Sequence, residues 1–519
     1  MGHWATAPLD RLQVTVFAPT LDDSLADDHP VRLFDETLRT MDFTAWESQY
    51  VRVVGQPPIH PRLLAGLILY GLSLGIRSSR KLEDACLNRL DFIWLMEGRC
   101  PDHSTICGFR TQHGQQLKDL FKQIGRVAIE MGLITLNQVA LDGTAIHGNA
   151  SRFKTARRAT IEEKLQSVDK QVEQLMAQAA EQDQVEDQLY GQETSPSKLP
   201  KELSDIKRRQ AKLKAALDHL KHRDKENAEK GTRNKAPAVA RTDPDARVLP
   251  NKGGGFGPNY TPVLAVDGSS GMVVDVQVLS GNNEVTTVLP AVDNIEQNFG
   301  EKPRQMLADS GFNNGPNLAG LHERGVEALM PAKIEMDASV AERSDPTEPV
   351  AKKSRVSLPI HPGTKILDKS AFIFDESKDC YYCPNGKRLD YVEDKPYQRV
   401  GSKGTYRIYE SPSCDGCPMS RRCLPRNATV RRVSRDEYEH LRKEMSARMK
   451  SESGKKSYNQ RGHIAETPFA VLKTAMNFRQ FLLRGLAKVT METYWAVTSY
   501  NMGKLMRAIA AERAVPAMG

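Results

Sequence analysis

The amino-acid sequence predicts an α/β fold: a mixed-sheet core, preceded by a helical domain and interrupted by two insertions. Apolar residues recur at helical spacing through residues 1–130, and short runs of strand character begin at about residue 133. Two long stretches, residues 161–240 and 336–455, interrupt the core pattern. A chain of 519 residues is too long for one ordinary core, which agrees with several domains or large insertions.

Residues 1–130 are expected to form an all-helical domain. Pro61 stands where a helix would begin, because proline fits the first helical turn. A second helix should carry the apolar residues Leu82, Cys86 and Leu90. A third should begin after the capping residue Asp102 and continue to Ile124 as one helix.

Two features of the chain favour an intracellular location. Its start lacks a basic segment followed by an apolar core, so no signal peptide is expected. The most apolar stretch, residues 63–76, is too short for a membrane span and should be a buried helix. We therefore expect a soluble cytoplasmic protein with reduced cysteines, in which Cys86, Cys100 and Cys107 are core thiols.

The strands and helices of the core follow one another in an informative order. Residues 133–160 contain the strand LNQVALDG, and residues 241–335 contain YTPVLAVDG and MVVDVQVLS, which a GSSG turn should join into a hairpin. A helix at 286–299 and the strand PRQMLADSG follow. The last segment, residues 456–519, begins with a helix that carries Glu466. Strand, hairpin, helix, strand and late helix is the order of a ribonuclease-H-like fold.

The first insertion, residues 161–240, has heptad spacing, in which apolar residues advance by steps of four and three. These residues are Ile161, Leu165, Val168, Val172, Leu175 and Ala179 and, after a break at GQETSPSKLP, Leu203, Ile206, Leu213, Leu217 and Leu220. Two such helices should pair as an antiparallel hairpin, followed by a charged linker. A coiled-coil arm and a surface insertion without function both agree with this pattern.

Three acidic residues have the positions that a metal-dependent site requires. Asp142 and Asp309 each end an apolar run and precede Gly or Ser-Gly, so each lies where a strand gives way to a turn. Glu466 lies in a helical stretch. Each signal is weak separately, because an aspartate after a strand is more often a turn residue. Together they could hold two hard divalent cations, which take oxygen ligands and assist in-line attack on phosphorus.

Basic charge gathers around Glu466. Over the whole chain Lys+Arg exceed Asp+Glu by 73 − 65 = 8, whereas residues 421–480 contain 15 Lys or Arg and 6 Asp or Glu, an excess of 9. This field suits a polyanion, although a charge run by itself is more often a solvated surface. Tyr458, Arg461 and Lys473 flank Glu466, and both cations can hold phosphates.

The second insertion, residues 336–455, contains a cysteine pattern of zinc-ribbon type. The cysteines are Cys380, Cys383, Cys414, Cys417 and Cys423. Five cysteines compete for the four positions of a tetrahedral structural zinc site. Either Cys380 or Cys423 is therefore left out, and both choices remain open from the spacing.

These motifs together resemble the DDE transposases of bacterial insertion sequences that carry the Y-R-E-K signature. The resemblance spans nearly the full length, through PDHSTICGFR, LDGTAIHGNAS, LADSGFNN and the final YNQRGHIAETPFAVLKTAMNFRQFLLRGL. It implies a catalytic triad with two Mg²⁺ or Mn²⁺ ions, and three DNA-contacting helpers. The implied triad is Asp142, Asp309 and Glu466. The implied helpers are Tyr458, Arg461 and Lys473.

The resemblance also implies a reaction and partners. The enzyme would cut double-stranded DNA at the terminal inverted repeats of its element and join the ends to target DNA, as a homodimer at the nucleoid. The helical domain would be a plain bundle, or a module for DNA ends or dimerisation. A single Cys before Pro-x-Gly in related transposases favours Cys383, Cys414, Cys417 and Cys423 as zinc ligands. The chain departs from the family pattern in one spacing, since four residues instead of three separate Arg461 from Glu466.

Two other functions remain open from the sequence. A ribonuclease-H-like nuclease would hydrolyse nucleic acid without strand transfer, and the presence of joined products would distinguish the two. A non-catalytic DNA-binding descendant of a transposase is the second alternative. The acidic trio and the complete Y-R-E-K block count against it, because a chain that does no catalysis has no need for all of them.

Overall fold

The structure is a computed structural model that describes residues 20–50, 57–190, 201–229, 238–251, 254–332, 341–399 and 402–514. It divides into two compact units. The first contains the described parts of 1–133, 470–479 and 491–519, and the second those of 134–469 and 480–490. The GQETSPSKLP break (191–200) and part of the expected linker (230–237) lie outside the described residues. The chain combines helices and mixed sheets, which confirms the α/β class.

The first unit is built from helices around an aromatic centre. They are α1 (Pro30–Arg39), α2 (Thr44–Glu47), α3 (Pro61–Ser73), α4 (Ser79–Asn88), α5 (Leu90–Leu95), α6 (His103–Gln112), α7 (Gly114–Glu130) and most of α15 (Leu486–Ala514). The Trp46 and Phe109 rings stack with centroids 5.4 Å apart, and Trp495 of α15 lies 6.2 Å from Trp46. The end of the chain therefore completes the core of the N-terminal helices.

Two expected helices of this unit are each divided into two. The expected second helix breaks at Arg89, whose extended backbone (φ −117°, ψ 124°) separates α4 from α5. The expected third helix breaks at His113 (φ −103°, ψ 47°), between α6 and α7. His113 is buried, with its ring centroid 4.6 Å from that of Phe109. Tertiary packing at this position outweighs the preference for a continuous helix.

The apolar stretch 63–76 lies mainly in α3, as expected for a buried helix, with Leu67 and Ile68 fully inaccessible. Cys86 is buried, but Cys100 and Cys107 are exposed, so the prediction of core thiols is wrong for these two. Cys107 follows the buried Ile106 in α6, and a step of one residue turns it about 100° away from the core face. None of the helices among the described residues is long and apolar enough to cross a membrane.

The centre of the second unit is a seven-stranded mixed sheet. Its strands are β1 (Gln138–Gly143), β2 (Ile146–His147), β5 (Arg247–Pro250), β6 (Phe256–Asp267), β7 (Val273–Leu279), β8 (Gln305–Leu307) and β9 (Glu327–Leu329). β6 pairs antiparallel with β1 and with β7, as the predicted hairpin requires, whereas β1, β8 and β9 run parallel. The continuously buried residues 139–141 and 263–266 are typical of a sheet covered on both faces.

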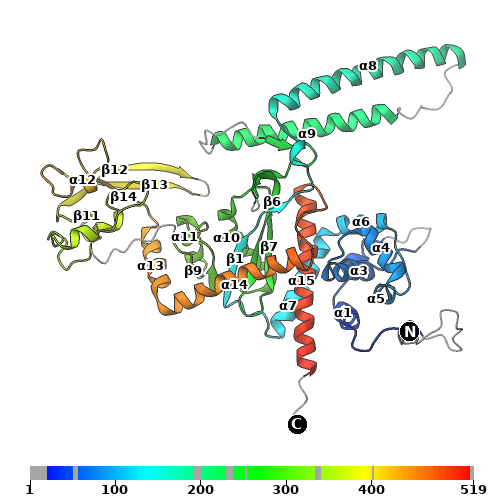
Figure 1. The fold of residues 1–519 in the computed structure, drawn as a ribbon, viewed down its shortest axis with the longest axis horizontal. Helices are drawn as coiled ribbons and strands as arrows, with labels where there is room; N and C mark the ends of the chain where they lie inside the picture. Colours follow the sequence, from blue (N-terminus) through cyan, green and yellow to red (C-terminus); the bar gives the residue numbers. More distant parts are fainter. Residues whose placement is uncertain are drawn as a thin grey trace, which may run out of the picture. The chain divides into compact units, whose positions relative to one another are not determined.

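Helices at the edges of this sheet complete the core. The short turn η2 (Glu284–Thr287) leads into α10 (Val288–Phe299), which packs against β7, and α11 (Gly315–Glu323) packs against β9 (Figure 1). The long helix α14 (Glu452–Thr474) belongs to this unit up to residue 469. The predicted helix at 286–299 is therefore present, with its first residues in η2.

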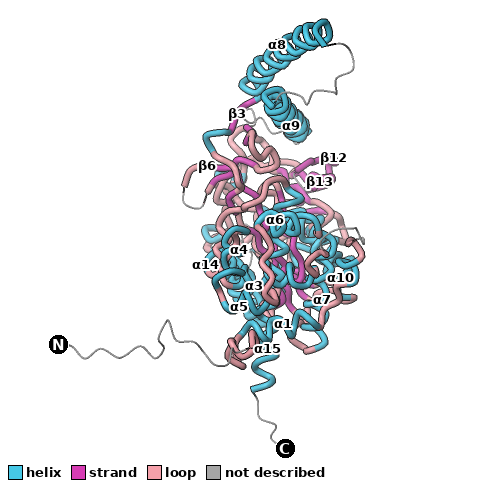
Figure 2. Tube along the Cα trace, turned by 90° about the vertical axis from the view of Figure 1, so that its right-hand side faces the viewer, coloured by secondary structure: helices cyan, strands magenta, loops and turns pink. Residues whose placement is uncertain are grey.

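The first insertion forms two paired helices. The helices α8 (Arg158–Tyr190) and α9 (Lys201–Glu229) lie side by side (Figures 1 and 2), flanked by η1 (Arg152–Lys154) and by the paired strands β3 (Thr155–Arg157) and β4 (Ala238–Ala240). Expected heptad residues from both helices share one apolar cluster: Ile161, Leu165, Val168, Val172, Leu175, Ile206, Leu213, Leu217 and Leu220. The side chains of Ala179 and Leu203 lie outside the described ones.

The second insertion contains an antiparallel five-stranded sheet. In spatial order its strands are β10 (Ile373–Asp375), β11 (Cys380–Tyr382), β12 (Arg388–Arg399), β13 (Ser402–Glu410) and β14 (Arg432–Arg435). Short helical turns η4 (Ser354–Ser357), η5 (Lys369–Ala371) and α12 (Ser420–Cys423) surround it, and α13 (Glu439–Lys450) follows. The fully buried rings of Tyr381 and Tyr409, 5.1 Å apart, lie in its core.

We predict that Asp267 is essential to the stability of the core hairpin. Its fully buried carboxylate accepts hydrogen bonds from the N–H groups of Leu136 (3.0 Å) and Ser270 (2.9 Å), which ties the β6–β7 turn to the start of β1. Asp267→Ala should lower the free energy of unfolding by about 3 kcal/mol or more, because buried donors lose a charged acceptor. Urea unfolding measures this loss. The control Asp293→Ala removes an exposed carboxylate paired with Arg324 and should cost under about 1 kcal/mol; equal losses would contradict the prediction.

Candidate active site

Asp142 and Asp309 lie at the same edge of the core sheet. The strands β1 and β8 pair in parallel with Ala140 opposite Leu307, and each aspartate comes two residues after its paired position. Parallel strands end at one edge, so this register brings both residues there. The N–H of Gly311 donates to Asp309 Oδ1 at 2.7 Å, which holds the carboxylate in its turn.

Glu466 reaches this edge from α14. Burial raises the pKa of the Asp142 carboxyl, and the charges of Asp309 and Glu466 raise it further. The guanidinium of Arg461 opposes these effects, since its Nη1 lies 3.9 Å from Asp142 Oδ1. The structure therefore brings Asp142 within electrostatic reach of both other predicted acids.

Two of the three expected DNA-contacting residues lie beside these acids. The Arg461 guanidinium is 6.0 Å from the centroid of the Tyr458 ring. Burial raises the pKa of Tyr458, Arg461 lowers it, and the charge of Asp309 raises it. Lys473 lies two helical turns after Glu466 on α14, in the segment that belongs to the first compact unit.

A fourth carboxylate, Glu284, lies at the same edge and was not predicted. Burial and the charges of Asp142 and Asp309 raise its pKa to about 7. No sequence motif marks Glu284. The directions of the strands do indicate its position. Because β1 and β7 are both antiparallel to β6, they run in the same direction. The segment after β7, which contains Glu284, therefore lies at the edge of the sheet where Asp142 lies.

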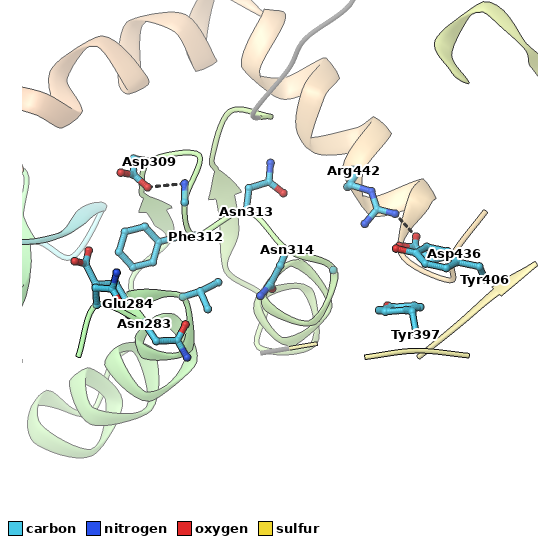
Figure 3. Close-up of a pocket in the computed structure, with 14 residues that line it drawn as sticks. Asn283, Glu284, Asp309, Phe312, Asn313, Asn314, Tyr397, Tyr406, Asp436 and Arg442 are labelled. Atoms are coloured by element: carbon cyan, nitrogen blue, oxygen red, sulfur yellow. Dashed lines mark hydrogen bonds and ion pairs between the residues drawn. The ribbon is translucent and has the colours of Figure 1, made fainter. Parts of the chain in front are cut away.

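Glu284 and Asp309 also line one side of a cavity of about 670 Å³. Figure 3 shows these two residues on one side of the cavity, with Tyr397, Tyr406 and Arg442 on the other side. The two tyrosine rings stack with centroids 4.3 Å apart, and Arg442 is paired with Asp436. The cavity is therefore acidic where it meets the core sheet, and it is lined by aromatic rings and a neutralised ion pair where it meets the second insertion.

The chemistry of the carboxylates fits a hard divalent cation, which takes oxygen ligands. Burial and then mutual repulsion raise the pKa values of Asp142 and Glu284, and a bound positive charge would offset the repulsion. Within the described ranges, however, no three His, Cys, Asp or Glu side chains are placed so as to hold a metal ion together. The structure thus shows the donor set and its crowding but no formed coordination site.

The cysteines of the second insertion are divided into a group of four and one separate residue. The group lines a small cavity and consists of Cys383, Cys414, Cys417 and Cys423. Burial raises the pKa of Cys423 to about 12, and the charges of the other three act in the same direction. Cys380 lies on β11 opposite Asp375. Burial raises the pKa of its thiol, and the neighbours that also affect this pKa are Tyr382, Arg388, Asp375 and Asp390, none of which is a cysteine. Four of the five cysteines therefore line one cavity while Cys380 lies apart from them, and none of the five is in a disulfide.

Two family models match the chain. The transposase domain (DUF772) matches residues 19–112, and the transposase DDE domain matches residues 382–506. The second match contains Glu466, whereas Asp142 and Asp309 lie outside both. No curated protein matches the chain. The two family matches support an insertion-sequence DDE transposase that acts in DNA transposition.

Proposed function

We propose that this transposase cuts DNA at the ends of its insertion sequence and joins them to target DNA, with Asp142, Asp309 and Glu466 as catalytic carboxylates. The observation that carries the proposal is the parallel register of β1 and β8, by which two of these residues reach one sheet edge. The effect of Glu466 on the pKa of Asp142 supports the third. The family matches favour DNA transposition over a nuclease that does not join strands.

The sheet supports a ribonuclease-H-like core. From β7 through β6 to β1 the neighbours are antiparallel, and β8 and β9 then run parallel to β1. The acidic residues follow β1 and β8 and lie on the late helix α14. This is the order of elements that the sequence predicts for such a core.

Each residue near the edge has a proposed part in the reaction. The three carboxylates would hold two Mg²⁺ or Mn²⁺ ions, whose chemistry is to lower the pKa of an attacking water and to stabilise a departing oxygen. Arg461, beside Asp142, can hold a phosphate with its planar fork, and Tyr458 can stack on a base. After cleavage frees a 3′-OH, the same site would align it with target DNA for transesterification.

The proposed partners follow from this reaction. The substrates are double-stranded DNA of the terminal inverted repeats and of the target. Joining two ends in one event calls for at least two copies of the site, so we propose a homodimer on DNA. Because the substrate is chromosomal DNA, the protein would act in the cytoplasm, at the nucleoid.

We predict that Asp309→Asn removes cleavage and joining while leaving DNA binding largely intact. The change keeps the shape of the side chain but removes a charged cation ligand, so the cleavage rate should fall at least about 10³-fold. A plasmid that carries the gene's flanking DNA, incubated with Mg²⁺, would reveal nicked and joined products on a gel. Asp293→Asn, on the exposed face of α10, should behave as wild type. Cleavage that survives in Asp309→Asn would remove Asp309 from the site, and cleavage without joining in wild type would support the nuclease alternative.

We predict that Lys473→Ala weakens DNA binding in a salt-dependent way. A lysine that contacts a phosphate releases counterions, so its removal should lower the slope of log K against log[salt] by about 1. Fluorescence anisotropy measures this slope, with a labelled DNA fragment from the end of the element and salt concentrations from about 50 to about 200 mM. An unchanged slope would argue against a phosphate contact.

We also propose a structural zinc ion held by Cys383, Cys414, Cys417 and Cys423. The purified chain should contain about one zinc ion, as tetrahedral thiolate sites do, and Cys414→Ser should lose it. Cys380→Ser is the matched control, because Cys380 lies outside the group of four and should not affect zinc content. Cys423→Ser should lose zinc as well, and retention of zinc in Cys423→Ser together with its loss in Cys380→Ser would exchange these two residues in the ligand set.

A further inference from the structure

The carboxylate of Glu284 lies directly against the backbone beside Asp142. Glu284 begins η2, immediately after the loop that follows β7. A Cβ atom placed on Gly143 would lie 2.6 Å from the Glu284 carboxyl carbon and from its Oε2. The Glu284 carboxylate occupies the space that a side chain at position 143 would need, so the fold brings a further carboxylate close to Asp142.

Glu284 lacks the partners that buried carboxylates of this core otherwise have. Asp267 accepts six hydrogen bonds from the N–H and hydroxyl groups of neighbouring residues. Asp275 accepts from the amides of Gln277 and Asn294. Throughout the described residues, no hydrogen bond or ion pair reaches the Glu284 side chain, although it is half-buried. A role in holding the fold together therefore does not explain its position.

We propose that Glu284 is a fourth carboxylate ligand for the divalent cations of the DNA-cleaving site. It lines the same cavity as Asp309 (Figure 3), its carboxyl group lies against Gly143 beside Asp142, and none of the described cationic side chains forms an ion pair with it. Oxygen-rich positions of this kind are those that hard divalent cations occupy. The inference rests on the proposed function, because it takes Asp142 and Asp309 to be cation ligands.

Direct measurement of Mn²⁺ binding to the full-length protein tests this inference independently of activity. The free-ion electron paramagnetic resonance signal would be titrated for wild type, Glu284→Gln, Asp309→Asn and Glu301→Gln. Glu284→Gln and Asp309→Asn should each weaken Mn²⁺ binding about tenfold or more, the scale seen when metal-site partners are removed. Glu301→Gln, an exposed carboxylate of the same unit, should bind Mn²⁺ as wild type does.

The outcomes separate this inference from the function on which it rests. Weak binding in Asp309→Asn with wild-type binding in Glu284→Gln would overturn the role of Glu284 and leave the proposed site intact. Wild-type binding in both would overturn the proposed site itself. If Glu284→Gln does not fold, Glu284→Ala replaces it and should weaken Mn²⁺ binding similarly. Unchanged binding in a folded Glu284→Ala would overturn the proposal.

Discussion

The pairing of β1 with its two neighbours is the constraint on which the rest of the candidate site depends. β8 on one side sets the register of Asp142 with Asp309, and β6 on the other side holds β1 in place. A slip of one residue would turn Asp142 to the opposite face of the sheet. β1 also positions α14 through a contact near each of its ends. Near the start of β1, the Gln138 amide donates to Ser457 Oγ at 2.8 Å. Near the end of β1, the Arg461 guanidinium approaches Asp142.

The turn after β6 completes this arrangement. A Cβ at Gly268 would lie 3.1 Å from the carbonyl oxygen of Gln138 and 3.3 Å from Ile464 Cδ1. Glycine there allows Ile464 of α14 to pack closely against the hairpin, which fixes this helix beside β1. Asp267 serves the turn with a fully satisfied carboxylate, whereas the acids at the other end of β1 are crowded against each other. Asp267 thus stabilises the turn by itself, whereas the repulsion among the acids at the other end of β1 is what a bound cation would offset under the proposed function.

Much of this architecture could be predicted from the sequence, because its signals are local. The apolar runs before Asp142 and Asp309, the GSSG turn and the heptad spacing of α8 and α9 each depend on neighbouring residues only. What was missed depends on distant ones. The aromatic cluster around the break at His113 includes Trp46 and Trp495, which come from opposite ends of the chain. Glu284 has no motif, and only the directions of three strands bring it to the site.

Arg461 shows how the structure answers a question that spacing leaves open. Four residues instead of three separate it from Glu466, which places the two side chains on different faces of α14. In the fold this difference does not remove Arg461 from the site, because its Nη1 is buried and 3.9 Å from Asp142 Oδ1. That distance exceeds the 2.7–2.9 Å, roughly, of a charge-assisted hydrogen bond, and Nη1 makes no hydrogen bond within the described structure. The guanidinium therefore offsets the charge of Asp142 without bonding to it. Under the proposed function, this unbonded donor is the group that would hold a phosphate oxygen of the substrate.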